Sequence, residues 1–422
     1  MIPTPRIIEA IVAQHAEEAA FQWLLRNDAI GAPHYSLSDL AHLDDRIAAH
    51  LDGLRLAGDA GWEICRRELQ WQEPGELFTA SVLAFESGQT AHIEAVAEAA
   101  AESPAAAPGL ASALAWLPYE TARPHLEKLL QSEVPLLRRL GLAVAALHRA
   151  ERHYADFGPT LESALREVDP TVTPRALRAA GELGRLELLS PCQALLTSDN
   201  NEIRFWAAWA TTVLGDKTAT SMLTAIASEG GPRAEYACTT AVRAMAPKQA
   251  RHWQRQLVDQ TDNRRLAVLA AGACGDPQLI PWLIETMSVD EQARVAGEAF
   301  TLITGVDLAF NDLQRDQPED FQAGPTEDPA DEDVALDADE DLAWPDADLV
   351  LAWWETNGRH FKPGQRHLAG LAVAEQTLQS VLRTGLQRQR IAAALELVLL
   401  KPGRPLFEVR ARGDRQTQLL ES

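Results

Sequence analysis

Apolar residues recur every three or four positions over most of the chain, which is the spacing of residues on one face of an α-helix. The pattern predicts a helix over residues 5–28, ended by Asn27 and Asp28 before Gly31 and Pro33. It predicts another over residues 38–57, which Ser38 can cap. The apolar face of this second helix consists of Leu40, Leu43, Ile47, Leu51 and Leu54. Runs of β-branched residues are scarce, so we expect an all-α protein.

One helical unit recurs between residues 201 and 307 at a step of about thirty residues. Its clearest copies read IRFWAAWATTVLGD (203–216), RRLAVLAAGACGD (264–276) and ARVAGEAFTLITGVD (293–307), and a fainter copy reads PRAEYACTTAVRAMA (232–246). Aligned without gaps, the clear copies share an arginine column and a glycine column: Arg204, Arg264 and Arg294, then Gly215, Gly275 and Gly305. Gly184 lies one step earlier, and Met245 takes the glycine position of the faint copy. The step predicts stacked helical hairpins, each too small to bury its apolar face alone.

The residues of each copy have structural explanations. Small residues such as Ala207, Ala267 and Gly297 let neighbouring helices approach closely, and the terminal glycine supplies the left-handed conformation that ends a helix. Acidic turns precede the arginine column, and we expect an aspartate there to cap the next helix and to pair with the arginine. Contact of these arginines with a ligand is the alternative. Cys274 occupies a core position and is expected to be a packed thiol rather than a nucleophile.

Composition narrows the partners and the compartment. A formal net charge of −23 over 422 residues argues against nucleic acid as the general partner, because such binding depends on neutralising phosphates. A basic or neutral protein is easier to accommodate. The four cysteines are too far apart for a disulfide framework or a zinc site, and no stretch reaches the roughly 20 apolar residues of a membrane span. The first residues also lack the apolar core of a signal peptide, so we expect a cytoplasmic protein. We expect no cofactor and no bound metal.

Residues 316–341 differ sharply in composition from the repeats. They contain twelve Asp or Glu, no Lys or Arg, and three prolines, so we expect a disordered acidic linker. Asp337, Asp339, Asp341 and Asp348 have the spacing of calcium ligands in an EF-hand. Leu342 stands where that loop needs glycine, which argues against a calcium site.

The last part of the chain is basic. Residues 359–415 contain eleven Lys or Arg against four Asp or Glu. The acidic linker could fold back onto this part, or the basic residues could bind a partner. The predicted partner contacts are residues that break the repeat pattern or lie in the basic part: Trp209, Trp354, Arg359, His360, Arg366 and His367.

The repeat resembles HEAT repeats of the short form found in phycobilisome-lyase-type proteins. The best single match is GDPQLIPWLIETMSVDEQARVAGEAFTLITG (275–305), with its Gly-Asp turn and its arginine-led second helix. The resemblance implies an all-α, HEAT-like α-solenoid in which the column arginines are structural. It divides the chain into an N-terminal helical cap (1–58), a repeat array (59–306), the acidic disordered linker (307–344) and a C-terminal helical unit (345–422).

The whole chain also resembles a little-characterised proteobacterial family, through PHYSLSDLAHLDDRIAAHLDGLRLAGDAGWEIC near the start and NGRHFKPGQRHLAG near the end. Members of that family are often encoded beside type VI secretion spike and effector genes. The resemblance implies a non-enzymatic scaffold that binds a secreted effector or toxin domain as an adaptor, a chaperone or an immunity protein. The alternative is a lyase-type enzyme acting on a small ligand. The sequence contains no phosphate-binding motif, no GxSxG motif and no HExxH motif. It therefore nominates no catalytic residue.

Overall fold

The computed structural model describes residues 7–149, 157–167, 169–260, 263–324 and 336–421. The chain forms two compact units. Unit 1 contains residues 1–31, 35–214 and 403–422, and unit 2 contains residues 32–34 and 215–402. This division differs from the four segments expected from the sequence, because the last twenty residues pack with the N-terminal helices rather than with residues 345–402.

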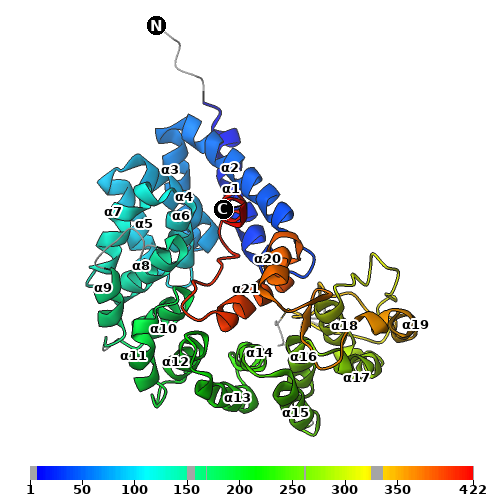
Figure 1. Cartoon of the computed structure of the whole chain (residues 1–422). Helices are drawn as coiled ribbons and strands as arrows, with labels where there is room; N and C mark the ends of the chain where they lie inside the picture. The colour runs from blue at the N-terminus through cyan, green and yellow to red at the C-terminus, as the bar shows by residue number, and fades with distance from the viewer. Residues whose placement is uncertain (1–6, 150–156, 168, 261–262, 325–335, 422) are drawn as a thin grey trace. The chain divides into compact units, whose positions relative to one another are not determined.

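Unit 1 is built of helical hairpins stacked in two rows. Its helices are α1 (Glu9–Ala29), α2 (Leu37–Ala57), α3 (Asp59–Glu68), α4 (Pro74–Ser87), α5 (Thr90–Glu102), α6 (Pro108–Trp116), α7 (Tyr119–Leu130), α8 (Pro135–His148), α9 (Phe157–Ala164), α10 (Val172–Glu182), α11 (Leu189–Ala194), α12 (Asn201–Val213) and α22 (Gly413–Glu421), with short 3-10 helices η1 (Leu69–Trp71) and η3 (Leu186–Leu188). The inner row, α4, α6, α8, α10 and α12, packs in sequence, each helix against the next. The outer row consists of α3, α5, α7, α9 and α11, and each contacts the inner helix that follows it. Figure 1 shows this curved array, with the red C-terminal segment on its inner side.

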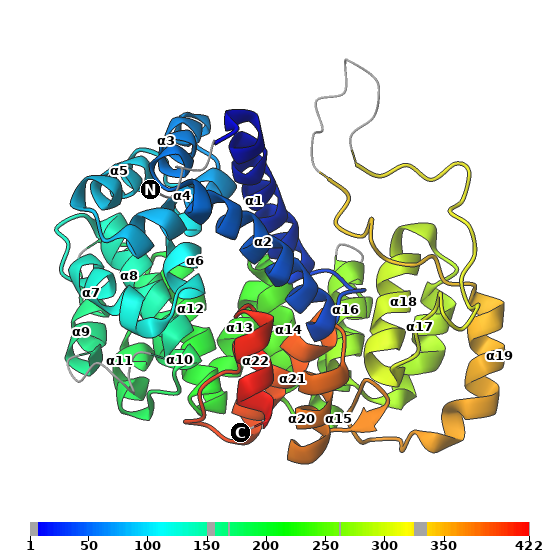
Figure 2. The same cartoon turned by 90° about the horizontal axis from the view of Figure 1, so that it is seen from above.

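Unit 2 has the same kind of architecture, helical hairpins in two rows. Its helices are α13 (Thr220–Glu229), α14 (Ala234–Ala244), α15 (Pro247–Val258), α16 (Arg264–Cys274), α17 (Ile280–Thr286), α18 (Asp290–Thr304), α19 (Ala347–Asn357), α20 (Glu375–Thr384) and α21 (Gln387–Leu400), with η4 (Lys217–Ala219), η6 (Pro277–Leu279), η7 (Gly358–His360) and a small antiparallel pair, β1 (His367–Leu368) and β2 (Leu371–Ala372). Here α14, α16 and α18 form the inner row, and α13, α15 and α17 form the outer row. Figure 2 shows α17, α18 and α19 side by side. The expected all-α, HEAT-like solenoid is confirmed.

Local sequence signals explain most helix ends. The side chain of Asn200 accepts hydrogen bonds from the backbone N–H groups of Glu202 and Ile203 and so caps α12. The sequence predicts Ser38 as the N-cap of α2, which is two residues too late. The N-cap is Ser36, which forms a reciprocal capping box with Asp39. In the Gly-Asp turn, the carboxylate of Asp276 caps the short helix η6 by accepting from the N–H of Gln278.

The glycines of the repeat column have a second structural role besides ending helices. Gly184, Gly215, Gly275 and Gly305 all have positive φ angles, as expected. A Cβ at Gly275 would lie 2.4 Å from the carbonyl oxygen of His367, and one at Gly305 would lie 2.7 Å from the carbonyl carbon of Ala369. In unit 1, a Cβ at Gly184 would lie 2.6 Å from the carbonyl oxygen of Gly403. The glycines therefore let later backbone segments lie directly against the ends of the inner-row helices.

The C-terminal segment of unit 1 is tied to several helices of the array. The N–H of Leu406 donates to the carbonyl of Glu182 at the end of α10. Arg415 donates to the carbonyl of Trp116, the last residue of α6, over 2.8 Å. The buried pair of Arg26 and Asp44 joins α1 to α2, and Asp44 also accepts from the N–H of Gly413 over 2.7 Å. The last twenty residues are therefore part of the fold of unit 1.

The described parts of the acidic segment are ordered, which corrects the expectation of a disordered linker for residues 307–324 and 336–344. Asp337 pairs with the buried guanidinium of Arg294 over 2.6 Å. The same guanidinium lies 4.8 Å from the ring centroid of Trp344 and 5.1 Å from that of Phe321. The sequence suggested disorder because the segment is acidic, but arginines of the array supply its counter-charges. The remainder of the predicted linker, 325–335, lies outside the described residues.

The arginine column does not pair with the acidic turns as expected. Arg204 donates to the carbonyl of Ser198 and to the side chain of Asn201, and Arg264 is exposed. The neighbouring Arg265 instead pairs with Asp339 over 2.5 Å. Of the arginine column, only Arg294 pairs with an aspartate of the described segments, and that aspartate is Asp337 of the acidic segment rather than a residue of the nearby turn. Guanidinium groups of α16 and α18 thus balance the carboxylates of residues 337 and 339, two of the four positions with calcium-ligand spacing.

The close approach at the glycine column predicts different costs for two alanine substitutions. Gly275→Ala should lower the free energy of unfolding through two effects. The left-handed conformation of an alanine costs at least about 1 kcal/mol, and crowding against His367 adds about 1–3 kcal/mol. Gly88→Ala is the matched control, because Gly88 has nearly the same backbone angles and no atom within 4 Å of its added Cβ. Urea unfolding followed by circular dichroism measures both. Equal losses in the two variants would show that the contact with residue 367 is not tight.

Candidate interaction surface

One charged surface of unit 2 is the exposed face of α15. Ala250, Gln254 and Leu257 recur at helical spacing and are buried in the unit, which fixes the orientation of the helix. Pro247 begins the helix at its first turn, where a missing N–H costs nothing. The sequence PKQARHWQRQLV therefore places its cationic residues on the side of α15 that faces away from the buried residues.

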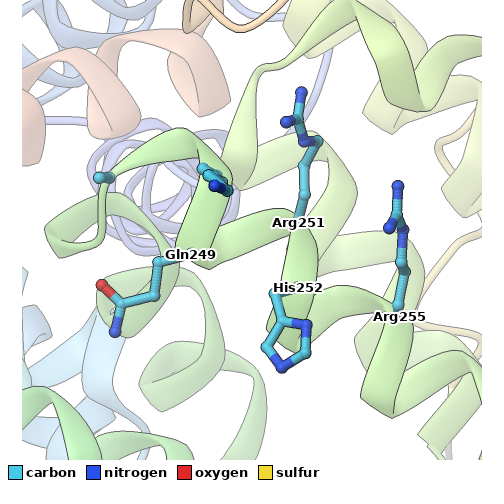
Figure 3. A pocket seen from close by; sticks show the side chains of 6 residues that line it. Gln249, Arg251, His252 and Arg255 are labelled. Carbon is cyan, nitrogen blue, oxygen red and sulfur yellow. The ribbon is translucent and has the colours of Figure 1, made fainter.

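A cavity of about 530 Å³ lies along this side of α15. Its lining consists of Ala246, Lys248, Gln249, Arg251, His252 and Arg255. Figure 3 shows Arg251 and Arg255 extending to the same side of the helix, one turn apart, while His252 points away from them. The lining contains no carboxylate and no thiol, so the cavity suits the binding of an anionic group better than covalent chemistry.

The positive charge of this cavity is only partly balanced. Arg251 pairs over 2.6 Å with Asp276, which is fully buried. Within the described ranges, neither Lys248 nor Arg255 has a carboxylate at salt-bridge distance. Three cations against one carboxylate leave two positive charges facing solvent. We call this set of residues (248, 251, 252 and 255) the basic stripe.

Asp276 also connects the basic stripe to the loop that the sequence nominated. Its carboxylate accepts from the N–H of Gly364 over 3.0 Å, so the loop 358–367 is anchored beside Arg251. Of the predicted contacts in this loop, Arg359 and His360 are exposed. They remain available to a partner.

Arg366, another predicted contact, has an internal role instead. It donates to the carbonyls of Val242 and Met245 at the end of α14 and to that of Cys274 at the end of α16, over 2.8 to 3.0 Å. It also pairs with Glu396 of α21, which pairs in turn with buried Arg243. Cations are favourable at helix C-termini, where four carbonyls lack intrahelical partners. Arg366 therefore caps two inner-row helices.

The other three predicted contacts are also largely committed to packing. His367 is 5% exposed and stacks edge-on against Phe361, with ring centroids 5.4 Å apart. Trp354 is half-buried against the same phenylalanine. Trp209 of unit 1 is 1% exposed, and a Cβ on Gly181 would lie 2.4 Å from its ring. Trp209 breaks the repeat pattern because it fills the groove that Gly181 leaves between α10 and α12.

The described residues offer little other site chemistry. Among them there is no group of three or more metal-ligating side chains. Burial raises the pKa of the Cys274 thiol to about 11, so this cysteine is an inert core residue, as expected. No helix among the described residues is long and apolar enough to span a bilayer.

The basic stripe was not singled out from the sequence, although a signal for it was present. Lys248, Arg251 and Arg255 recur at spacings of three and four residues, which places them on one helical face. The pattern spans only eight residues of a chain whose net charge is −23, and its three cations are few beside the eleven of residues 359–415.

Comparison with protein families agrees with the architecture. The family model described as HEAT repeats matches residues 158–243, which run from α9 to α14. This part of the chain is therefore similar to HEAT repeats, which commonly serve as scaffolds for protein interactions and are typically non-catalytic. No match is found among curated proteins.

The internal role of Arg366 predicts a large loss of stability on its removal. Arg366→Ala should lower the free energy of unfolding by about 3–5 kcal/mol, because three helix-end carbonyls lose their donor and buried Glu396 keeps only one of its two cationic partners, Arg243. Exposed Arg359 is the control, and its alanine variant should change stability by no more than about 0.5 kcal/mol. Denaturant unfolding of both variants tests this. A small effect at Arg366 would return it to the set of candidate partner contacts.

A buried carboxyl group makes the stability of unit 2 depend on pH. Glu298 of α18 is 18% exposed and lies 4.0 Å from Arg388 of α21. Burial raises its pKa from 4.5 to about 7, although Arg388 opposes the change. The folded pKa lies above the unfolded one, so this contribution to stability is complete below pH 4.5 and is lost as the pH rises through 7.

Replacing this carboxyl group with an amide should remove the pH dependence. Glu298→Gln should be more stable than the wild type by roughly 2–3 kcal/mol at pH 8 and nearly equal to it at pH 4.5. Urea unfolding at the two pH values measures the difference. Glu285→Gln, at an exposed position of α17, is the control and should show no such change. A pH-independent difference for Glu298→Gln would contradict the raised pKa.

Proposed function

We propose that this protein is a non-enzymatic protein-binding scaffold that acts as an adaptor or chaperone for an effector of a type VI secretion system. The observation that best supports a scaffold is the HEAT-like array, with an open basic cavity on an outer-row helix. The secretion role rests on the resemblance of the whole chain to a family often encoded beside type VI secretion genes.

The charge of the candidate surface favours an adaptor over an immunity protein. An immunity protein for a basic toxin would present carboxylates to it, and its complex would be tight because the toxin must remain blocked. The open cavity of this protein instead presents cations on α15. Such a surface suits the reversible holding of a cargo that is released during secretion.

Co-expression with the effector encoded beside its gene should yield a complex that co-purifies at low ionic strength and weakens as salt is added, because exposed charge pairs are screened. Deleting the gene should then block export of that effector while the cells survive. Death or growth arrest of the deletion strain, relieved by inactivating the effector, would indicate an immunity protein instead. Failure of every neighbouring gene product to co-purify at low salt would reject the scaffold role in secretion.

A further inference from the structure

We infer that the basic stripe of α15 binds an acidic segment of a partner protein, and this inference rests on the proposed function as a scaffold. The stripe is an interaction surface of defined chemistry. Its cavity is large enough to enclose side chains, and its lining offers cations without a competing carboxylate.

The geometry suits carboxylates in particular. Arg251 and Arg255 are four residues apart on one helix, so their guanidinium groups are separated by about one turn, roughly 5–6 Å along the axis. A guanidinium group donates two parallel hydrogen bonds to a carboxylate. Asp276 fixes the position of Arg251, whereas Lys248 and Arg255 are exposed and keep their charges available. Lys248 and Arg255, about two turns apart, can therefore each hold one carboxylate of a segment that runs along α15, with Arg251 between them.

The negative charge of the whole chain does not prevent such binding. At physiological ionic strength, interactions between exposed charges fall off over about 8 Å. The uncompensated charges of the basic stripe therefore dominate the field inside the cavity, because carboxylates elsewhere on the chain are screened from it. Nucleic acid is disfavoured because its phosphates extend well beyond one helix and would lie close to other parts of a chain with a net charge of −23. A short acidic segment presents its charges only where the cations are.

The opposite flank of α15 places an aromatic ring, that of Trp253, beside the basic stripe. A second cavity of about 420 Å³ is lined by Ser228, Trp253, Gln256, Leu257, Asp259 and Gln260. Trp253 directly follows His252 in the helix, so the two cavities border the same few turns of α15. A segment that contacts both flanks carries two or more carboxylates on the side of the basic stripe and places one aromatic side chain against Trp253, away from Asp259.

The first test measures binding of labelled peptides to the full chain by fluorescence polarisation. The probe is a twelve-residue peptide rich in Glu with one Trp, and the comparison peptide has Gln in place of each Glu. The variant K248E/R255E should bind the acidic peptide about tenfold more weakly or worse, because two attractions become repulsions. The matched control is K217E/R264E, which changes the net charge equally at two exposed positions of unit 2 outside the cavity.

The expected result is salt-sensitive binding of the acidic peptide by the wild type and the control variant, with loss only in K248E/R255E. Slower hydrogen exchange in α15 on adding the peptide would support the same site. Equal binding by K248E/R255E and the wild type would overturn the inference. So would tighter binding of a single-stranded DNA oligonucleotide than of the peptide at this stripe.

The same variants separate this inference from the proposed function. If the effector co-purifies equally with the wild type and K248E/R255E, the scaffold role stands and the basic stripe is not its binding site. If the acidic peptide binds at α15 but no neighbouring gene product co-purifies, the site stands and the secretion role fails.

Discussion

The unpaired carbonyls at the ends of the inner-row helices set the constraint on which the rest of the structure depends. Each α-helix leaves its last four carbonyls without intrahelical partners, and a stacked array places many such ends close together. Arginines from later in the chain satisfy several of them: Arg366 in unit 2 and Arg415 in unit 1. Backbone N–H groups of residues 367, 369 and 370 satisfy others. Segments within the last 57 residues of the chain therefore complete the ends of the repeat helices.

The glycine column makes this arrangement possible. A side chain at Gly184, Gly275 or Gly305 would collide with the backbone that approaches the helix end. Where the fainter copy has Met245 instead, its carbonyl accepts a hydrogen bond from the long side chain of Arg366. One column of the repeat thus encodes both the end of each helix and the docking of a distant segment.

The sequence predicted the helices, their stacking and the left-handed glycines, because these depend on local periodicity and backbone preference. It could not predict what lies against the glycines, since the segments come from 64 residues (Ala369 against Gly305) to 219 residues (Gly403 against Gly184) further along the chain. The same limit applies to Arg294, whose carboxylate partner is Asp337 rather than a residue of the nearby turn. Composition alone predicted disorder for the acidic segment, because it does not reveal the distant arginines that pair with its carboxylates. Arg366 and His367 were predicted to be available because a basic loop is usually exposed, yet Arg366 donates to helix-end carbonyls and His367 is buried.

These internal contacts also determine which surfaces remain for a partner. In unit 2, residues 366–370 cover the ends of α16 and α18. Those helix ends therefore stabilise the fold and are not available for binding a partner. The outer helix α15 has no such cover over its cationic side, where a cavity remains. Asp276 takes part both in the internal packing and in the basic stripe. Its carboxylate caps the turn after α16 and accepts a hydrogen bond from the N–H of Gly364 in the covering loop. The same carboxylate pairs with Arg251 of the basic stripe. The packing that completes the array thereby also positions one of the cations that face solvent.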